Sequence, residues 1–249
     1  MKVVTLNYSG SVGKTMVASH LLAPRMNEAK IFAVESTNES AQDLGLVADQ
    51  LRGEHFGRLF RELLTLDNAI VDVGASNIEA FLDHLMKYDD SHLEFDYFVL
   101  PVIGSGKAQR ETITTIETLS ELGIEASRIR VIFNRVNADV HDEFPAIFGH
   151  QIAYAKFIAN ESAAVYDNEV FDLLAAAKTT INAVLSDETD YRQLLRETDK
   201  SNAAEVSRLA NCHALKSLAR PVVRNLDLAF SALFAAPAGS TPSTARKRS

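Results

Sequence analysis

The stretch Leu6-Asn7-Tyr8-Ser9-Gly10-Ser11-Val12-Gly13-Lys14-Thr15 decides the fold that we predict for this chain of 249 residues. It overlaps the end of a short apolar run, Val3–Leu6, and precedes an apolar-periodic segment, residues 16–22. A strand, a glycine-containing turn and a helix form the setting in which Gly-Lys-Thr is typical of a phosphate-binding loop. The full pattern G-x-x-x-x-G-K-[ST] is not met, because Tyr8 stands where its first glycine belongs. The sequence therefore predicts a nucleotide-binding loop whose missing glycine needs an explanation.

Each part of this loop has a chemical task in phosphate binding. Backbone N–H groups and the positive end of the following helix hold phosphate oxygens, and Gly13 lets the backbone approach closely. Lys14 can reach the β- and γ-phosphates, while the Thr15 hydroxyl can bind Mg²⁺. We therefore predict phosphate binding by the loop and the first helical turn, through Gly10, Ser11, Val12, Gly13, Lys14, Thr15 and Met16.

The composition is typical of a globular protein with its own core. Of the residues, 47% are hydrophobic and 23% are charged, and no apolar run approaches the roughly 18 residues of a membrane span. Cys212 is the only cysteine, which excludes a disulfide framework and favours a reducing compartment. We therefore expect a cytoplasmic protein without a signal peptide. The formal net charge of −8 argues against a protein that coats DNA with its whole surface.

Apolar runs alternate with helical patterns along the first part of the chain. The patterns between the runs include residues 14–25, 78–87 and 110–122, and the apolar runs are Val3–Leu6, Ile31–Glu35, Asn68–Val73, Tyr97–Val102 and Ile129–Phe133. Continuous Val, Ile, Phe and Leu runs are typical of parallel strands that are covered on both faces. The order predicts an α/β fold with a doubly wound, mostly parallel sheet, in which ligands bind at the carboxyl ends of the strands.

The pattern changes beyond residue 150. Residues 171–184, 191–196 and 203–219 have helical patterns, and no strong strand candidate follows. We therefore expect a nucleotide-binding α/β core over residues 1–150 and a mainly helical C-terminal layer over 151–234. Residues 235–249 are rich in Ala, Pro, Ser and Thr and include the basic triplet Arg246-Lys247-Arg248, which predicts a disordered basic tail.

Two acidic residues end predicted strands beside the loop. Asp72 can bind Mg²⁺ directly or through water, and its structural alternative is a carboxylate that caps the turn at Gly74. Glu35 and the polar residues after it can position an attacking water, or they can form a solvated connection.

Asn134 and Arg135 end the fifth predicted strand. The Asn134 amide can meet a purine edge and Arg135 can stack on the ring, whereas the structural alternative is a turn-forming asparagine. A guanine-reading site would usually add an acid two residues beyond the basic residue, and Asn137 stands there. Adenine is therefore the base that the sequence favours.

Taken together, these motifs resemble the ParA/MinD family of P-loop ATPases. The variant loop of that family reads Lys-Gly-Gly-x-Gly-Lys-Thr and opens nearly at the N-terminus, and the matching window here is residues 9–15. Ser9 replaces the signature lysine and Ser11 replaces a glycine. The resemblance covers about residues 1–137, and it also includes the acidic ends of the second and third strands, the pattern Pro101…Lys107-x-Gln109 and Asn134-Arg135.

This resemblance implies a cytoplasmic ATPase that takes ATP or ADP and Mg²⁺ and can form a homodimer. It implies catalytic roles for Lys14 and Glu35, and Mg²⁺ ligation by Thr15 and Asp72. Within the family the chain is similar to plasmid stability proteins. That similarity implies a small DNA-binding partner of the same operon, with a role in plasmid maintenance, positioning or conjugative transfer.

Two departures from the family pattern concern turnover. Ser9 is too short and uncharged to cross a dimer interface as the signature lysine does, and Thr37 stands where the family has a catalytic aspartate. We therefore expect slow or partner-dependent hydrolysis. Two alternatives stay open: a nucleotide-binding adaptor that hardly turns over, and a metabolic kinase or synthetase.

Direct DNA contact is a separate question. Lys216, Arg220 and Arg224 are spaced by four and can line one helical face, although Pro221 is expected to interrupt it. The alternatives are a DNA-contacting face and a solvated helix end. The short apolar stretch 226–234 lacks a basic polar face, so no membrane insertion is expected.

Overall fold

The computed structural model describes residues 1–34, 49–51 and 56–236. Its sheet has seven strands in the order β3-β2-β4-β1-β5-β6-β7, and every neighbouring pair is parallel. The strands are β1 Lys2–Thr5, β2 Lys30–Val34, β3 Asp49–Leu51, β4 Ala69–Val73, β5 Tyr97–Val102, β6 Ile129–Val136 and β7 Ile158–Tyr166. The doubly wound α/β fold is confirmed.

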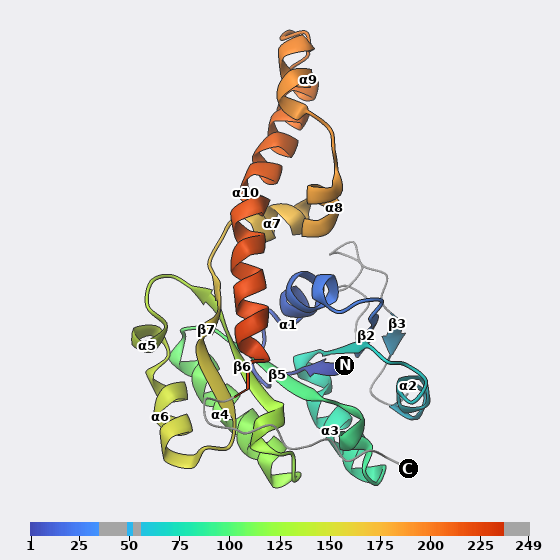
Figure 1. The fold of residues 1–249 in the computed structure, drawn as a ribbon, viewed down its shortest axis with the longest axis vertical. Coiled ribbons are helices and arrows are strands. Elements are labelled where there is room, and N and C mark those ends of the chain that lie inside the picture. Colours follow the sequence, from blue (N-terminus) through green and yellow to red (C-terminus); the bar gives the residue numbers. More distant parts are fainter. Residues whose placement is uncertain (35–48, 52–55, 237–249) are drawn as a thin grey trace.

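Helical segments connect the strands and cover both faces of the sheet (Figure 1). The α-helices are α1 Lys14–Met16, α2 Phe56–Leu63, α3 Ile78–Lys87, α4 Gly106–Glu121, α5 Val140–Glu143, α6 Pro145–Tyr154, α7 Val170–Ala176, α8 Ile181–Ser186, α9 Tyr191–Glu197 and α10 Ala203–Leu233. A π-helical segment, η1 Val17–Leu22, continues α1, and short 3₁₀ turns are η2 Ala23–Arg25, η5 Ala75–Asn77, η6 Ser91–Glu94 and η7 Ala126–Arg128.

Two hydrophobic clusters, one on each face, hold these layers together. Because side chains alternate along a strand, Val4 of β1 joins the cluster under α2, α3, α4 and α6, whereas Val3 joins the cluster under η1, α7, α8 and α10. Both residues are fully buried. Burial on both faces explains why the central strands read as continuous apolar runs.

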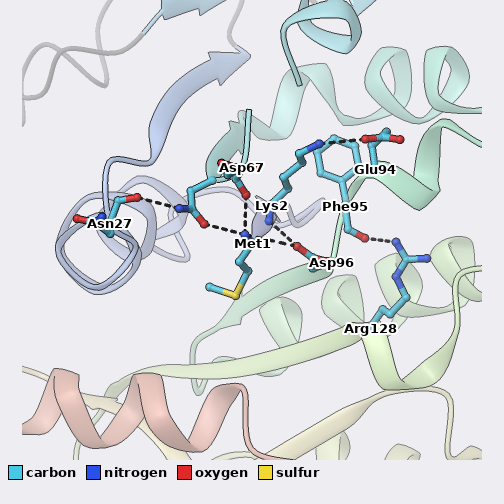
Figure 2. Close-up of polar contacts among 9 residues, drawn as sticks. Met1, Lys2, Asn27, Asp67, Glu94, Phe95, Asp96 and Arg128 are labelled. Carbon is cyan, nitrogen blue, oxygen red and sulfur yellow. Dashed lines mark hydrogen bonds and ion pairs between the residues drawn. The ribbon is translucent and has the colours of Figure 1, made fainter. Parts of the chain in front are cut away.

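The amino end of β1 is fixed by polar contacts at the edge of the sheet opposite the loop (Figure 2). The main-chain nitrogen of Lys2 donates to the Asp96 carboxylate at 2.7 Å, and Lys2 Nζ donates to Glu94 at 3.0 Å. Arg128 donates to the main-chain oxygens of His92 and Phe95. The Lys2 contacts join β1 to the segment before β5, and the Arg128 contacts join the turn before β6 to the same segment.

The two outermost strands were not predicted from the sequence. The expectation of no strand beyond residue 150 is wrong, because β7 pairs in parallel with β6. Its centre is interrupted by exposed Glu161 and Ser162 and by irregular register, as is usual at a sheet edge. At the other edge, β3 was not among the predicted strands.

The expected helical C-terminal region is present and includes a helix longer than expected. Helix α10 has 31 residues and runs through Pro221, so the interruption expected at this proline is wrong. Ala219 and Val222 are buried on either side of the proline, and this packing offsets the lost backbone hydrogen bond. Figure 1 shows α10 leaving the sheet and projecting beyond α7 and α8, with α9 beside its far end. None of the helices that the structure describes is both long and apolar enough to cross a membrane.

Candidate nucleotide-binding site

The loop predicted to bind phosphate lies at the carboxyl end of β1, the central strand of the sheet. Helix α1 begins at Lys14 directly after Gly13, which has φ +90°. Ser11 also has a positive φ of 57°, and the ParA/MinD pattern has a glycine at this position. The loop therefore takes a backbone course that favours glycine at two positions, although only one of them is glycine.

The side chain of Lys14 lies over its own loop. Its Nζ donates to the main-chain oxygens of Asn7 at 3.0 Å and Ser9 at 2.8 Å, and the residue is buried. An ammonium group in this place is next to the loop backbone, where a phosphate group would be held.

Asn7 anchors the start of the loop to the neighbouring strand and helix. Its Nδ2 donates to Pro101 O at 2.8 Å and to Thr112 Oγ1 at 2.6 Å. Its Oδ1 accepts from the Ser9 main-chain nitrogen at 2.9 Å, and the Tyr8 nitrogen donates to Thr115 Oγ1 at 3.2 Å. Sequence reasoning missed this anchor. A polar residue directly after an apolar strand was its only signal.

Asn134 anchors the other end of the loop from β6. Its Nδ2 donates to Val12 O at 2.8 Å, and the residue is buried. A Cβ atom on Gly13 would lie 2.2 Å from that same nitrogen. Only glycine therefore fits at position 13 while this hydrogen bond is present. The amide nitrogen predicted to meet a purine edge is therefore in contact with the loop. The amide oxygen of Asn134 remains as a second polar group of this side chain.

A cavity of about 170 Å³ opens beside the start of α1. Three residues predicted to bind the nucleotide line it: Met16, Asn134 and Arg135. Arg135 is exposed and has φ 54°. The remaining lining residues come from the end of β7, from the turn after it and from α7, and sequence reasoning missed them because the strand itself was missed; they are Tyr166, Asp167, Asn168, Phe171 and Asp172.

His20 of η1 contacts Phe171, one of the residues that line this cavity. Its ring is 6.0 Å from the ring of Phe171, and both ring nitrogens lack a hydrogen-bond partner among the described residues. Burial lowers the pKa of His20 to about 4, because desolvation disfavours the charged imidazolium. The imidazole is therefore neutral at pH 7.

Arg25 caps the C-terminal end of η1. It donates to the main-chain oxygens of His20 and Leu21 at 3.0 Å each. It also pairs with Asp227 of α10 at 2.8 Å. The loop helix is therefore tied to the long C-terminal helix.

The two predicted Mg²⁺ ligands are Thr15 and Asp72. Thr15 lies in α1, and Asp72 is a buried residue of β4 whose Oδ1 accepts a hydrogen bond from Thr5 Oγ1 at 2.8 Å. A hydroxyl and a carboxylate are oxygen donors, which Mg²⁺ prefers, and this ion usually completes its shell with water and substrate phosphates. Among the described residues no group of three or more His, Cys, Asp or Glu side chains could hold a metal alone. Glu35 and Thr37 lie outside the described residues.

Other motifs singled out in the sequence have structural contacts. Gln109 Nε2 donates to the main-chain oxygens of Gly104 and Glu143, which ties α4 to the α5 region. Ser105 caps α4 by accepting from the Ala108 nitrogen at 3.2 Å. Ser105 and Gln109 therefore fix the turn that leads into α4.

The three basic residues of α10 differ in their surroundings. Lys216 donates to the main-chain oxygens of Asp187 and Thr189 and lies 5.9 Å from the ring centre of Tyr191. Arg220 and Arg224 are exposed. The basic triplet 246–248 lies outside the described residues.

Comparison with solved structures identifies the fold. A chain of the MinC:MinD cell division protein complex from Aquifex aeolicus is 13% identical with a TM-score of 0.54, covering 90% of this chain and 96% of that chain. The cell division ATPase MinD from Pyrococcus furiosus is 12% identical with a TM-score of 0.51, covering 90% and 98%. Apo McdA from Cyanothece is 16% identical with a TM-score of 0.50, covering 74% and 92%. No protein-family model and no curated protein matches the sequence. The chain has the P-loop fold of ParA/MinD-type proteins.

Proposed function

We propose that this chain binds ATP or ADP together with Mg²⁺ through the loop of residues 10–16. The observation that supports this most strongly is the loop itself, which leaves the central strand and starts α1 at Lys14 after a left-handed Gly13. That course gives the phosphates a row of backbone N–H groups and the positive helix end. Lys14 Nζ would exchange Asn7 O and Ser9 O for phosphate oxygens when a nucleotide binds.

The Mg²⁺ ion would be held by the Thr15 hydroxyl and the Asp72 carboxylate beside the phosphates. When bound, it would neutralise phosphate charge and polarise the bond that is cleaved. The buried position of Asp72 suits this role, because a buried carboxylate gains most from a cation or a hydrogen-bond donor.

The base would occupy the cavity beside Met16, next to Asn134 and Arg135. Phe171 and Tyr166 supply apolar and aromatic surface there, and Asp167 and Asp172 supply hydrogen-bond acceptors. A carboxylate can accept from the exocyclic amine of adenine or of guanine, so the preference for adenine rests on Asn137 alone.

Hydrolysis is proposed to be slow or dependent on a partner. Ser9 is buried, its main-chain groups bond within the loop, and its side chain carries no charge. Position 9 therefore provides no cation for a nucleotide on a second copy of the chain, and a cation aimed at developing charge can contribute orders of magnitude in rate.

The biological role that we propose is an ATP-dependent switch in plasmid maintenance, positioning or conjugative transfer, in the cytoplasm. The support is the sequence resemblance to the plasmid stability protein StbB, in residues 1–15, 32–36, 69–78 and 133–136. A small DNA-binding protein of the same operon, similar to StbA, would be the partner, and a homodimer would be the switching form. A nucleotide-binding adaptor without turnover is the second candidate, supported by the uncharged Ser9.

The test is nucleotide binding and turnover with matched lysine variants. Fluorescent ATP is titrated into the full chain, Lys14→Ala and Lys107→Ala, because Lys107 also follows a glycine but its side chain is 79% exposed beside Glu111. We expect Lys14→Ala to lose binding at least tenfold and Lys107→Ala to bind as the unchanged chain does.

Turnover is then measured with and without the operon partner. Stimulation by the partner supports the switch, and binding without turnover in both conditions supports the adaptor. An unchanged chain that binds no ATP, or one that hydrolyses ATP rapidly alone, contradicts the proposal.

A further inference from the structure

The last residue of β1, Thr5, contacts the predicted metal-binding carboxylate. Thr5 Oγ1 donates to Asp72 Oδ1 at 2.8 Å, and strand pairing places the two residues directly opposite each other. Thr5 is 0% exposed and Asp72 is 3% exposed. The contact is therefore a buried, charge-assisted hydrogen bond within the sheet.

A hydroxyl at this position is not needed to build the strand. Val3 and Val4 fill the two preceding positions of β1, and valine has the same branched shape as threonine. What threonine adds is one donor, held at a fixed angle because a β-branched side chain has few χ1 rotamers. That donor goes to the carboxylate beside the phosphate loop.

We propose that Thr5 is a positioning residue for Mg²⁺, acting through Asp72. This inference rests on the proposed function, because it assigns Thr5 to the metal of that same nucleotide site. The hydroxyl holds the Asp72 carboxylate in one orientation before the ion binds. The side chain therefore loses less conformational entropy when Mg²⁺ binds. Groups that orient a metal ligand in this way typically contribute about tenfold to a hundredfold in metal affinity.

The experiment separates metal binding from nucleotide binding. The dissociation constant of fluorescent ATP is measured in excess EDTA and at increasing Mg²⁺ for the unchanged chain, Thr5→Val, Thr5→Ser and Ser91→Ala. Ser91 is the matched control, because it is fully buried and donates to Leu85 O at 2.8 Å outside the nucleotide site. Thermal unfolding with and without Mg²⁺ is recorded for each protein.

We expect Thr5→Val to need about tenfold more Mg²⁺ while its ATP affinity in EDTA stays within about twofold. Thr5→Ser keeps the donor and should stay within about threefold of the unchanged chain. Ser91→Ala should change melting temperature without changing the Mg²⁺ requirement.

Three results would overturn the inference. The first is an unchanged Mg²⁺ requirement in Thr5→Val, and the second is a Mg²⁺ requirement in Thr5→Ser that rises as much as in Thr5→Val. The third is a loss of ATP affinity in EDTA in Thr5→Val that matches its loss with Mg²⁺, which would show that the hydroxyl only supports the loop. If Thr5→Val does not fold, Thr5→Ala is read by the same criteria. The proposed function fails separately, when the unchanged chain itself shows no ATP binding or no gain from Mg²⁺.

Discussion

Replacing Gly13 by alanine should destabilise the protein, and Asn134 should account for much of the loss. A Cβ atom would lie 2.2 Å from Asn134 Nδ2, so this amide must leave Val12 O, to which it donates at 2.8 Å. Leaving such buried groups without partners costs about 1–3 kcal/mol. The φ of +90° adds about 1–2 kcal/mol for any residue with a Cβ atom. We therefore expect Gly13→Ala to lower the free energy of unfolding by about 2–5 kcal/mol.

A double-mutant cycle isolates the part that comes from the contact. Asn134→Ala alone removes the hydrogen bond and should cost about 1–3 kcal/mol. In that background the new Cβ meets no amide, so Gly13→Ala should add only the backbone term of about 1–2 kcal/mol. The double variant should therefore be more stable than the sum of the single effects predicts, by about 1–3 kcal/mol.

Urea unfolding of the four proteins, followed by circular dichroism, gives the four free energies. The unchanged chain and the three variants must show similar denaturant slopes for the cycle to be read. Additivity within about 0.5 kcal/mol would refute the reasoning, because it would show that residues 13 and 134 do not share the contact.

Three further predictions concern the loop helix and its neighbours. For His20, the pKa is about 4 in the fold and 6.5 without burial, so the unfolded chain binds more protons between these values. The free energy of unfolding should therefore fall by up to about 3 kcal/mol as the pH drops from 6.5 to 4, and His20→Leu should remove this part of the slope in urea titrations. Arg25→Met should cost about 2–3 kcal/mol, because three main-chain oxygens lose a charged donor. Asp227→Asn should cost less than about 1 kcal/mol, because the Asp227 side chain is 60% exposed; equal losses in urea unfolding would contradict this. Ser11→Gly should raise stability by about 0.5–1 kcal/mol, since relief at φ 57° exceeds the entropic cost of glycine, and a lower melting temperature would argue against it.

The sequence predicts the centre of the sheet better than its edges. Strands such as β5, Tyr97–Val102, are buried on both faces, so their apolar runs and their bounds agree with the prediction. The edge strand β7 carries exposed Glu161 where a central strand would be apolar, and its register is irregular. Charged and polar residues are common on an edge strand. Hydrophobic periodicity therefore does not distinguish such a strand from a loop.

In the candidate site, features formed by consecutive residues were easier to predict than contacts between residues far apart in the sequence. The loop before α1 could be singled out because its residues are consecutive, and the strand ends could be singled out because a parallel sheet places them on one side. The side-chain contacts were not predicted. Asn7 meets Thr112 and Thr5 meets Asp72 across more than sixty positions, and such pairs are set by strand order and register.

Those long-range contacts also explain how the loop tolerates its departures from the family pattern. Asn7 fixes the start of the loop to β5 and α4, and Asn134 fixes Val12 from β6. With both ends fixed by side chains, Ser11 can hold a left-handed conformation that a free loop would leave to glycine. The loop therefore reaches the start of α1 without a glycine at position 11, and position 9 carries no charge. Under the proposed function, nucleotide binding depends on the part of the loop that is kept, and rapid hydrolysis depends on the part that is lost.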